Sequence, residues 1–418
     1  MAAIELDLAH AYVSHPQSDD DYALLPLRFT FRDGGAYALL GPSGCGKTTL
    51  LNCISGLLKP SQGRILFDGR DVTGLTPQQR NIAQVFQFPV VYDTMTVADN
   101  LAFPLRNRGM PEAHIQGRVG RIAEMLDMSA QLNRRASGLS ADAKQKISLG
   151  RGLVRSDVSA VLFDEPLTVI DPHLKWQLRR KLKEIHQELN LTLIYVTHDQ
   201  TEALTFAEEV VVMSRGKAVQ IGTPEDLFER PAHTFVGNFI GSPGMNFLPA
   251  QWQGGVLTVG TSRLWDGRAS QAPAHSPSDS AAVSAATGGG VGSASMPDVN
   301  APVDTGSVHH AADATSSRHP SADWPPHRAA SLADAGDVRL GVRPEYLQPC
   351  AANTPGAVPV QVSRVQDLGT YLLLSGEFEG SLLRARARAG SAVAVGDTVW
   401  LPLLNTHTCF YRNEELLT

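Results

Sequence analysis

A glycine-rich loop near the N-terminus carries the residues whose types and spacing most clearly suggest chemistry. Residues 41–49, GPSGCGKTT, fit the pattern G-x-x-x-x-G-K-[ST] between a predicted strand and a predicted helix. The glycines let successive backbone N–H groups face inward around a polyphosphate. Lys47 would neutralise charge on the β- and γ-phosphates, and the Thr48 hydroxyl would coordinate Mg²⁺. The predicted ATP loop consists of Gly41, Pro42, Ser43, Gly44, Cys45, Gly46, Lys47, Thr48 and Thr49.

Two adjacent carboxylates form a second element, in AVLFDEP at residues 160–166. They follow four apolar residues at the predicted carboxyl end of a strand, where α/β proteins bind their ligands. Asp164 is expected to hold Mg²⁺, and Glu165 to accept a proton from an attacking water as general base. Acidic residues also end strands because loops are solvated, but the pairing with residues 41–49 favours catalysis.

Two further polar residues complete the predicted site. His198 ends another predicted strand, in IYVTHDQ, where an imidazole could bond the γ-phosphate and hold the water in line. A lone histidine is more often a packed or surface residue, so its position beside the phosphate site carries this prediction. Gln87, in VFQFP, would contact Mg²⁺ and sense the third phosphate.

Alternating short β-branched runs and amphipathic stretches must position these residues. The predicted strand–helix pairs are 37–41 with 47–58, 158–165 with 173–189, and 191–198 with 199–209. In the middle helix the apolar positions step by three or four and form one buried stripe: Leu174, Leu178, Leu182, Ile185 and Leu189. This pattern predicts an α/β sheet with parallel strands.

Composition excludes several classes of protein. The 418 residues are 43% hydrophobic and 19% charged, enough for at least one large core, and two domains are expected. A net charge of -6 argues against a nucleic-acid partner, and the short basic runs at 178–183 and 383–388 are interpreted as solvated surface. Four cysteines without C-x-x-C spacing indicate a reducing compartment. No run of about 18 apolar residues is present, so the chain is not expected to cross a membrane by itself.

The sequence changes character after residue 240. Short alternating runs with Gly and Pro breaks predict a small β-rich domain over 241–418. Residues 266–335, rich in Ala, Ser, Pro, Gly and His, are expected to be a disordered insertion because they lack the apolar side chains needed for a core.

Taken in order, the motifs GPSGCGKTT, VFQFP, LSADAKQK, LFDEPLTVID and YVTHDQ resemble the nucleotide-binding subunits of ABC transporters. The resemblance covers residues 1–240 and implies a P-loop ATPase domain with a mixed sheet and a helical subdomain at about 88–157. The segments FIGSPGMNFLPA and LGVRPEYLQP resemble the OB-like C-terminal domain of sugar and polyol importer ATPases. Within that group the chain is most similar to one of the two ATPase subunits of glycerol importers.

This resemblance implies further roles and partners. Tyr12 matches the aromatic residue that stacks on adenine, and Asp171 matches the aspartate of a loop that crosses the dimer interface. The segment after Gln87 would receive a short helix from one of two membrane-spanning permease subunits. A substrate-binding protein would take part indirectly, and the chain would lie at the cytoplasmic face of the plasma (inner) membrane.

One motif departs from the family pattern L-S-G-G-Q, because this chain has Ser140, Ala141 and Asp142 after Leu139. In the family each signature contacts the ATP held by the opposite subunit. At about 5 Å and an effective dielectric near 20, the charge of Asp142 would oppose a phosphate charge by about 3 kcal/mol. LSADAKQK would also cap its helix, with Ser140 at the N-cap. We therefore expect an asymmetric pair with a second ATPase that has an intact signature, since a homodimer would carry the defect twice.

The leading hypothesis is the ATP-hydrolysing motor of an importer for glycerol, glycerol phosphate or a related polyol or sugar. One alternative is an ATP-binding regulatory subunit with little hydrolysis, against which Glu165 and His198 count. The other is a soluble ABC ATPase of translation or DNA repair, which would carry two nucleotide modules or a long coiled coil. The transported substrate and the choice between homodimer and heterodimer stay open.

Overall fold

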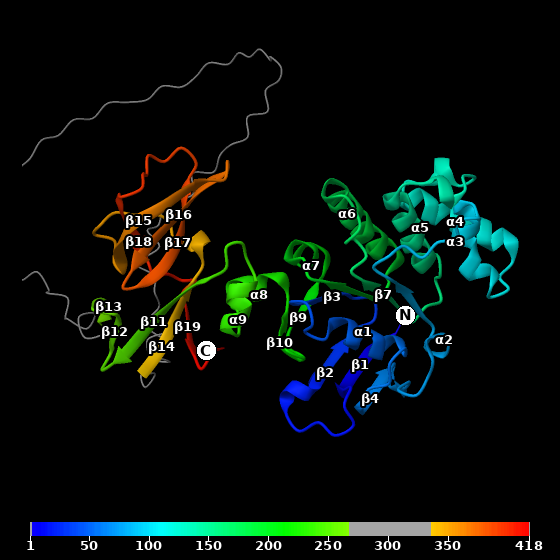
Figure 1. Ribbon diagram of the computed structural model, residues 1–418, viewed down its shortest axis with the longest axis horizontal. Coiled ribbons are helices and arrows are strands. Elements are labelled where there is room, and N and C mark those ends of the chain that lie inside the picture. The colour runs from blue at the N-terminus through cyan, green and yellow to red at the C-terminus, as the bar shows by residue number, and fades with distance from the viewer. Residues whose placement is uncertain (1, 267–335, 418) are drawn as a thin grey trace, which may run out of the picture.

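The computed structural model describes residues 2–266 and 336–417 (Figure 1). The expected disordered insertion therefore lies, apart from Asp266, outside the described residues. In Figure 1 the N-terminal part, which carries the helices, and the β-rich C-terminal part lie side by side. Within the described part of the chain, no helix is long and apolar enough to cross a bilayer.

A six-stranded sheet in the order β10-β9-β3-β8-β7-β6 forms the centre of the N-terminal part. Its strands are β3 (Ala36–Leu40), β6 (Ile82–Val85), β7 (Ala160–Asp164), β8 (Leu193–Thr197), β9 (Glu209–Ser214) and β10 (Lys217–Gly222). All neighbours pair in parallel except β9 and β10. Because parallel strands end at one edge, residues that follow β7 and β8 are brought together there.

A second, antiparallel sheet covers one face of the first, in the order β2-β1-β4-β5. It contains β1 (Ile4–Ala11), β2 (Tyr22–Phe31), β4 (Gln62–Phe67) and β5 (Arg70–Asp71). Helix α1 (Lys47–Ser55) packs between the sheets through Leu50, Leu51 and Ile54, which are fully buried. The short helix α2 (Pro77–Arg80) follows β5. The helix predicted over 47–58 ends earlier because Gly56 adopts a left-handed conformation.

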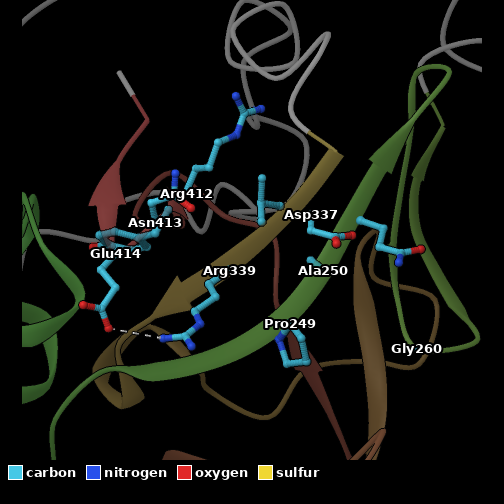
Figure 2. Close-up of a pocket in the computed structure, with 11 residues that line it drawn as sticks. Pro249, Ala250, Gly260, Asp337, Arg339, Arg412, Asn413 and Glu414 are labelled. Atoms are coloured by element: carbon cyan, nitrogen blue, oxygen red, sulfur yellow. Dashed lines mark ion pairs between the residues drawn. The ribbon is translucent and has the colours of Figure 1, made fainter.

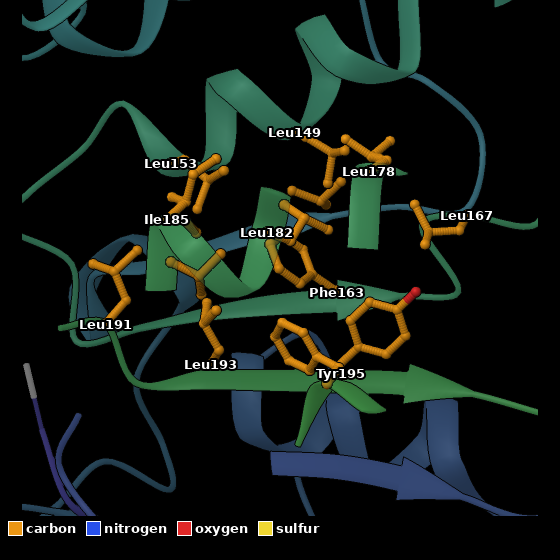
Figure 3. Close-up of a cluster of buried hydrophobic side chains, with 14 of the residues drawn as sticks. Leu149, Leu153, Phe163, Leu167, Leu178, Leu182, Ile185, Leu191, Leu193 and Tyr195 are labelled. Atoms are coloured by element: carbon orange, nitrogen blue, oxygen red, sulfur yellow. The ribbon is translucent and has the colours of Figure 1, made fainter. Parts of the chain in front are cut away.

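Helices cover the other face of the central sheet. They are α3 (Val97–Arg106), α4 (Glu112–Met125), α5 (Ala141–Leu153), α6 (Pro172–Leu189) and α7 (Gln200–Phe206). Three members of the predicted stripe of α6, Leu178, Leu182 and Ile185, are buried and pack over Phe163 and Tyr195 of the sheet (Figure 3). The other two, Leu174 and Leu189, are only partly buried. Contrary to expectation, the basic run 178–183 is not all solvated, because the helix turns Arg179 inward, where it is 9% exposed.

The C-terminal part is built from two antiparallel sheets, in agreement with the predicted β-rich domain. One has the order β13-β12-β11-β14-β19-β20, and the other β17-β16-β15-β18. The first contains β11 (Asn246–Gln253), β12 (Val256–Val259), β13 (Ser262–Asp266), β14 (Gly336–Val342), β19 (Cys409–Arg412) and β20 (Glu415–Leu416). The second contains β15 (Ala357–Asp367), β16 (Tyr371–Phe378), β17 (Ser381–Arg388) and β18 (Thr398–Pro402). Both sheets share one hydrophobic core.

Two short helices join the parts, α8 (Pro224–Glu229) and α9 (Thr234–Phe239). Arg343, which is 1% exposed, donates hydrogen bonds to the backbone carbonyls of Leu227, Phe228 and Ile240. Its guanidinium also lies 4.0 Å from the centre of the Phe228 ring. A buried cation that satisfies several carbonyls holds the β-rich part against these helices.

Candidate functional site

The loop at residues 41–49 has the backbone that a phosphate cradle requires. Gly44 and Gly46 have φ values of +77° and +102°, in the left-handed region that favours glycine. A Cβ atom on Gly46 would lie 2.5 Å from the carbonyl oxygen of Ala23. On Gly41 it would lie 2.3 Å from the carbonyl oxygen of Met213. The loop is therefore closely packed from outside, and α1 begins at its end with Lys47.

Lys47 folds back over this loop. The residue is 6% exposed, and its Nζ donates hydrogen bonds to the carbonyl oxygens of Gly41 and Pro42 at 2.9 and 3.0 Å. The ammonium thus lies beside the loop that leads into the N-terminal end of α1. Both features place positive charge at one spot, which suits a polyphosphate.

An exposed aromatic ring stands next to the loop. The ring of Tyr12 is 68% exposed, and its hydroxyl lies 3.2 Å from the hydroxyl of Thr49. Behind it, the buried ring of His10 packs edge-on at a centroid distance of 4.7 Å. No sequence motif marks His10, which lies near the end of β1, and Tyr12 directly follows that strand.

Thr48 and Asp164 meet across the gap between α1 and β7. The Thr48 hydroxyl donates a hydrogen bond to Asp164 Oδ1 at 3.3 Å. Burial raises the pKa of Asp164, and the nearby charge of Glu165 acts in the same direction. A hydroxyl and a carboxylate oxygen, both atom types that Mg²⁺ accepts as ligands, therefore lie next to each other. Within the described ranges, no group of three His, Cys, Asp or Glu residues could hold a metal by itself.

Glu165 and His198 also meet, at the carboxyl edge of β7 and β8. Glu165 Oε1 lies 3.1 Å from His198 Nδ1, and Glu165 Oε2 accepts a hydrogen bond from Thr168 at 3.3 Å. Glu165 has φ +47°, a conformation that is uncommon for residues other than glycine. Its N–H donates to the carbonyl of Val196, which fixes this turn to the neighbouring strand. The side chains are 22% and 54% exposed, so water can reach the pair.

The remaining candidate residues lie next to the ends of other elements. Gln87 follows β6 by two residues and is partly buried. Asp171 is the N-cap of α6 and accepts a hydrogen bond from the N–H of His173 at 3.0 Å. Ser140 caps α5 as predicted, with Asp142 in the first turn. In Figure 1, α5 lies with α3 and α4, apart from α1.

Two hollows are present, one in the C-terminal part and one that borders the phosphate loop. A cavity of about 610 Å³ in the C-terminal part is bordered by β11, β14 and the turn after β19, with Arg339 and Glu414 paired at 3.9 Å (Figure 2). A cleft of about 860 Å³ extends from the outer side of Pro42, Ser43 and Gly44 to the same ion pair. The first hollow contains none of the predicted site residues.

The structure therefore defines a P-loop nucleotide-binding protein: a glycine-rich loop at a helix start, with carboxylates and an imidazole at the edge of a parallel sheet. The family model described as ABC transporter matches residues 24–168, and that described as TOBE domain matches residues 340–409.

Relatives match over most of the chain. The sn-glycerol-3-phosphate import ATP-binding protein UgpC of Pectobacterium atrosepticum is 36% identical over 90% of this chain and 89% of its own. The trehalose import ATP-binding protein SugC of Mycobacterium tuberculosis is 47% identical over 62% of this chain and 65% of its own. The oligosaccharides import ATP-binding protein MsmX of Bacillus subtilis is 43% identical over 62% and 70%.

The chain belongs to the ATP-binding subunits of ABC transporters. It is an ATP-hydrolysing motor subunit, and such subunits work with membrane-spanning permeases. The similarity to import proteins gives no support to a soluble non-transport ATPase or a regulatory subunit.

Proposed function

We propose that this chain hydrolyses ATP with Glu165 and His198 to drive the import of glycerol phosphate or a related polyol or sugar. The observation that carries the proposal is the 3.1 Å contact between these two side chains, at the sheet edge where Asp164 also meets Thr48 of the phosphate-loop helix. In this proposal Glu165 is the general base, His198 contacts the phosphate, and residues 41–49 cradle it, each from a neighbouring element of one fold.

The nucleotide would be held at both of its ends. The N–H groups of residues 41–49 and the ammonium of Lys47 would bind the β- and γ-phosphates. The exposed ring of Tyr12, supported from behind by His10, would stack on adenine. Gln87 would contact the magnesium shell and sense the γ-phosphate, as its place after β6 permits.

Thr48 and Asp164 would hold Mg²⁺, because a hydroxyl and a carboxylate oxygen suit this ion. When bound, the ion would neutralise charge on the phosphate oxygens.

Hydrolysis would be an in-line displacement at the γ-phosphorus. The water oxygen forms a bond to phosphorus, the bond from phosphorus to the bridging oxygen breaks, and ADP leaves with that electron pair. Glu165 takes the proton of the attacking water. His198 has Nδ1 against Glu165, so a ring protonated at both nitrogens would donate from Nδ1 to Glu165 and from Nε2 to a γ-phosphate oxygen.

The cargo and the assembly are inferred from the relatives. The names of UgpC, SugC and MsmX mention glycerol phosphate, trehalose and oligosaccharides, so the proposed cargo is a small polyhydroxylated molecule. Two permeases would receive the motor at the cytoplasmic face of the membrane, with a substrate-binding protein delivering the cargo. The side chains of Phe88, Val90 and Tyr92 are exposed and would offer apolar contacts to a permease helix.

The second ATPase would differ from this chain at the signature. The charge of Asp142 in the first turn of α5 favours its own helix, but it would oppose the phosphates of an ATP held by a partner. We infer that this chain pairs with an ATPase bearing Gly-Gly at these positions, and that a self-pair is feeble.

The test measures phosphate release from the full chain alone and with a second ATPase, two permeases and a binding protein in proteoliposomes. We expect little release from the lone chain, and release in the full complex that rises with glycerol phosphate or sugar. Asp142→Asn should raise the activity of the lone chain at least about tenfold. Such a gain is smaller than the ~3 kcal/mol of charge repulsion that the substitution removes would allow. Glu112→Gln, which removes a first-turn charge from α4, should have no effect. High activity of the unaltered lone chain would refute the asymmetric pair, and absence of cargo stimulation would refute import of this class.

A further inference from the structure

A buried carboxylate lies beneath β8, the strand that precedes His198. Glu202, in the first turn of α7, is 3% exposed. Its Oε2 accepts hydrogen bonds from the hydroxyls of Tyr195 at 3.0 Å and Thr197 at 2.8 Å. Both donors belong to β8, on one face of the strand, and Figure 3 shows the ring of Tyr195 among the core side chains. Sequence analysis did not single out Glu202.

These hydrogen bonds bracket His198. The Thr197 hydroxyl donates to Glu202, which leaves its lone pairs to accept from the backbone N–H of Asp199 at 3.0 Å. The residue before His198 and the residue after it are thus joined through one hydroxyl. Because an ionised carboxylate only accepts, Glu202 sets the direction of that hydroxyl.

A lysine connects the same carboxylate to the dimer-interface loop. Lys175 Nζ lies 3.5 Å from Glu202 Oε1, and the lysine side chain is 26% exposed. Lys175 belongs to the first turn of α6, and its N–H donates to the carbonyl of Asp171. A displacement of Asp171 with the start of α6 would therefore move the cation away from Glu202.

We propose that Glu202 is a positioning residue that holds His198 against Glu165, and that Lys175 makes this placement depend on the position of the Asp171 loop. The inference deepens the proposed function and rests on the role given there to His198. A partner subunit that contacts Asp171 would thereby influence the position of His198 in this chain. Hydrolysis at this site would then respond to the partner through this ion pair, in addition to the contact of the partner's signature with the ATP.

A purely structural role makes different predictions. A buried carboxylate is costly unless it is paired, so its removal can destabilise a fold without any effect on a nearby site. If Glu202 acted only in this way, its loss would lower the melting temperature and leave the position of His198 unchanged. The test must therefore observe His198 itself.

The experiment compares Glu202→Gln, Lys175→Met and Lys175→Arg in the full transporter complex. Glu202→Gln should lower kcat about tenfold while the Kd for ATP stays within about twofold, since the phosphate loop is untouched. Lys175→Met should lower kcat less, and Lys175→Arg should restore it. Glu188→Gln is the matched control, because Glu188 pairs with Arg121 on the exposed side of α6.

Two further measurements separate positioning from stability. In a crystal structure of Glu202→Gln, His198 Nδ1 should lie farther from Glu165 than 3.1 Å. In a His198→Ala background, Glu202→Gln should cause no further loss of kcat, because residues that act through one another are not additive. An unmoved His198 ring, or losses that add, would overturn the inference. If His198→Ala alone leaves kcat unchanged, the proposed role of His198 fails, while the crystal structure still decides whether Glu202 positions the ring.

Discussion

Arg80 anchors the far end of the phosphate-loop helix, and its replacement by Met should unfold the ATPase domain at a markedly lower temperature. The residue is 2% exposed. Nη1 donates to the carbonyls of Cys53 and Ile54 at 2.7 and 2.9 Å, at the end of α1. Nε and Nη2 donate to the carbonyls of Leu75 and Thr73, each at 3.0 Å. One side chain thus satisfies four carbonyls that lie away from solvent.

The expected cost follows from these four contacts. A hydrogen bond to a charged group contributes about 1.5–3 kcal/mol, but burial of the guanidinium offsets part of the sum. That burial also lowers the pKa of Arg80. We therefore expect Arg80→Met to lower the free energy of unfolding by about 4 kcal/mol, because four carbonyls lose their donor while the desolvation cost of the guanidinium is removed. For a domain of about 240 residues this corresponds to a fall in Tm of about 10 °C.

Calorimetry of the full chain without nucleotide measures this effect. The control is Arg106→Met. Arg106 also has several partners, the carboxylates of Asp99 and Glu112, but its side chain is 45% exposed. Exposed ion pairs contribute about 1 kcal/mol or less, so Tm of the control should fall by no more than about 3 °C. Equal Tm values for the two variants would refute the role given to buried carbonyl contacts.

Three further predictions concern the site. Gly46→Ala should abolish ATP binding, because its Cβ would meet a backbone carbonyl at 2.5 Å. The control is Gly69→Ala, where φ is also positive at +77° but the space is open, and the Kd for ATP should stay unchanged in the same titration. Asp164→Asn should abolish hydrolysis yet raise Tm of the nucleotide-free chain at neutral pH. Burial raises the folded-state pKa of Asp164, so the unaltered protein loses stability as pH rises through that pKa. The Asn variant has no such loss, and a lower Tm of the variant would contradict this. In a fluorescence titration, Tyr12→Phe should retain the affinity for ATP and Tyr12→Ala should weaken it. Equal affinities of these two variants would exclude stacking.

The parts of the site that could be predicted are those that a local pattern controls. The phosphate loop depends on glycines within nine residues, and the carboxylates of β7 and the imidazole after β8 follow from the rule that parallel strands end at one edge. The buried stripe of α6 follows from its period. The sequence also predicted the cap at Ser140, because the N-cap preference is a property of a single turn.

The parts that could not be predicted depend on contacts between distant residues. Arg80 looks like any surface arginine after a turn, and only the fold brings it to carbonyls 26 and 27 residues away. Arg179 belongs to a basic run, yet the helix turns it inward. Glu202 resembles an ordinary first-turn acid until β8 and α6 supply its partners. A sequence shows such residues to be polar, but it does not show which of them will be buried.

The most direct test of the account is a single-turnover measurement on the assembled transporter with Glu165→Gln in this chain. The account predicts that the variant binds ATP with the affinity of the unaltered chain, because the phosphate loop and Lys47 are intact. It also predicts that phosphate release at this chain's site falls at least about a thousandfold, since the water loses its base. Undiminished release, or loss of ATP binding, would contradict the assignment of Glu165 and His198 as the hydrolytic pair.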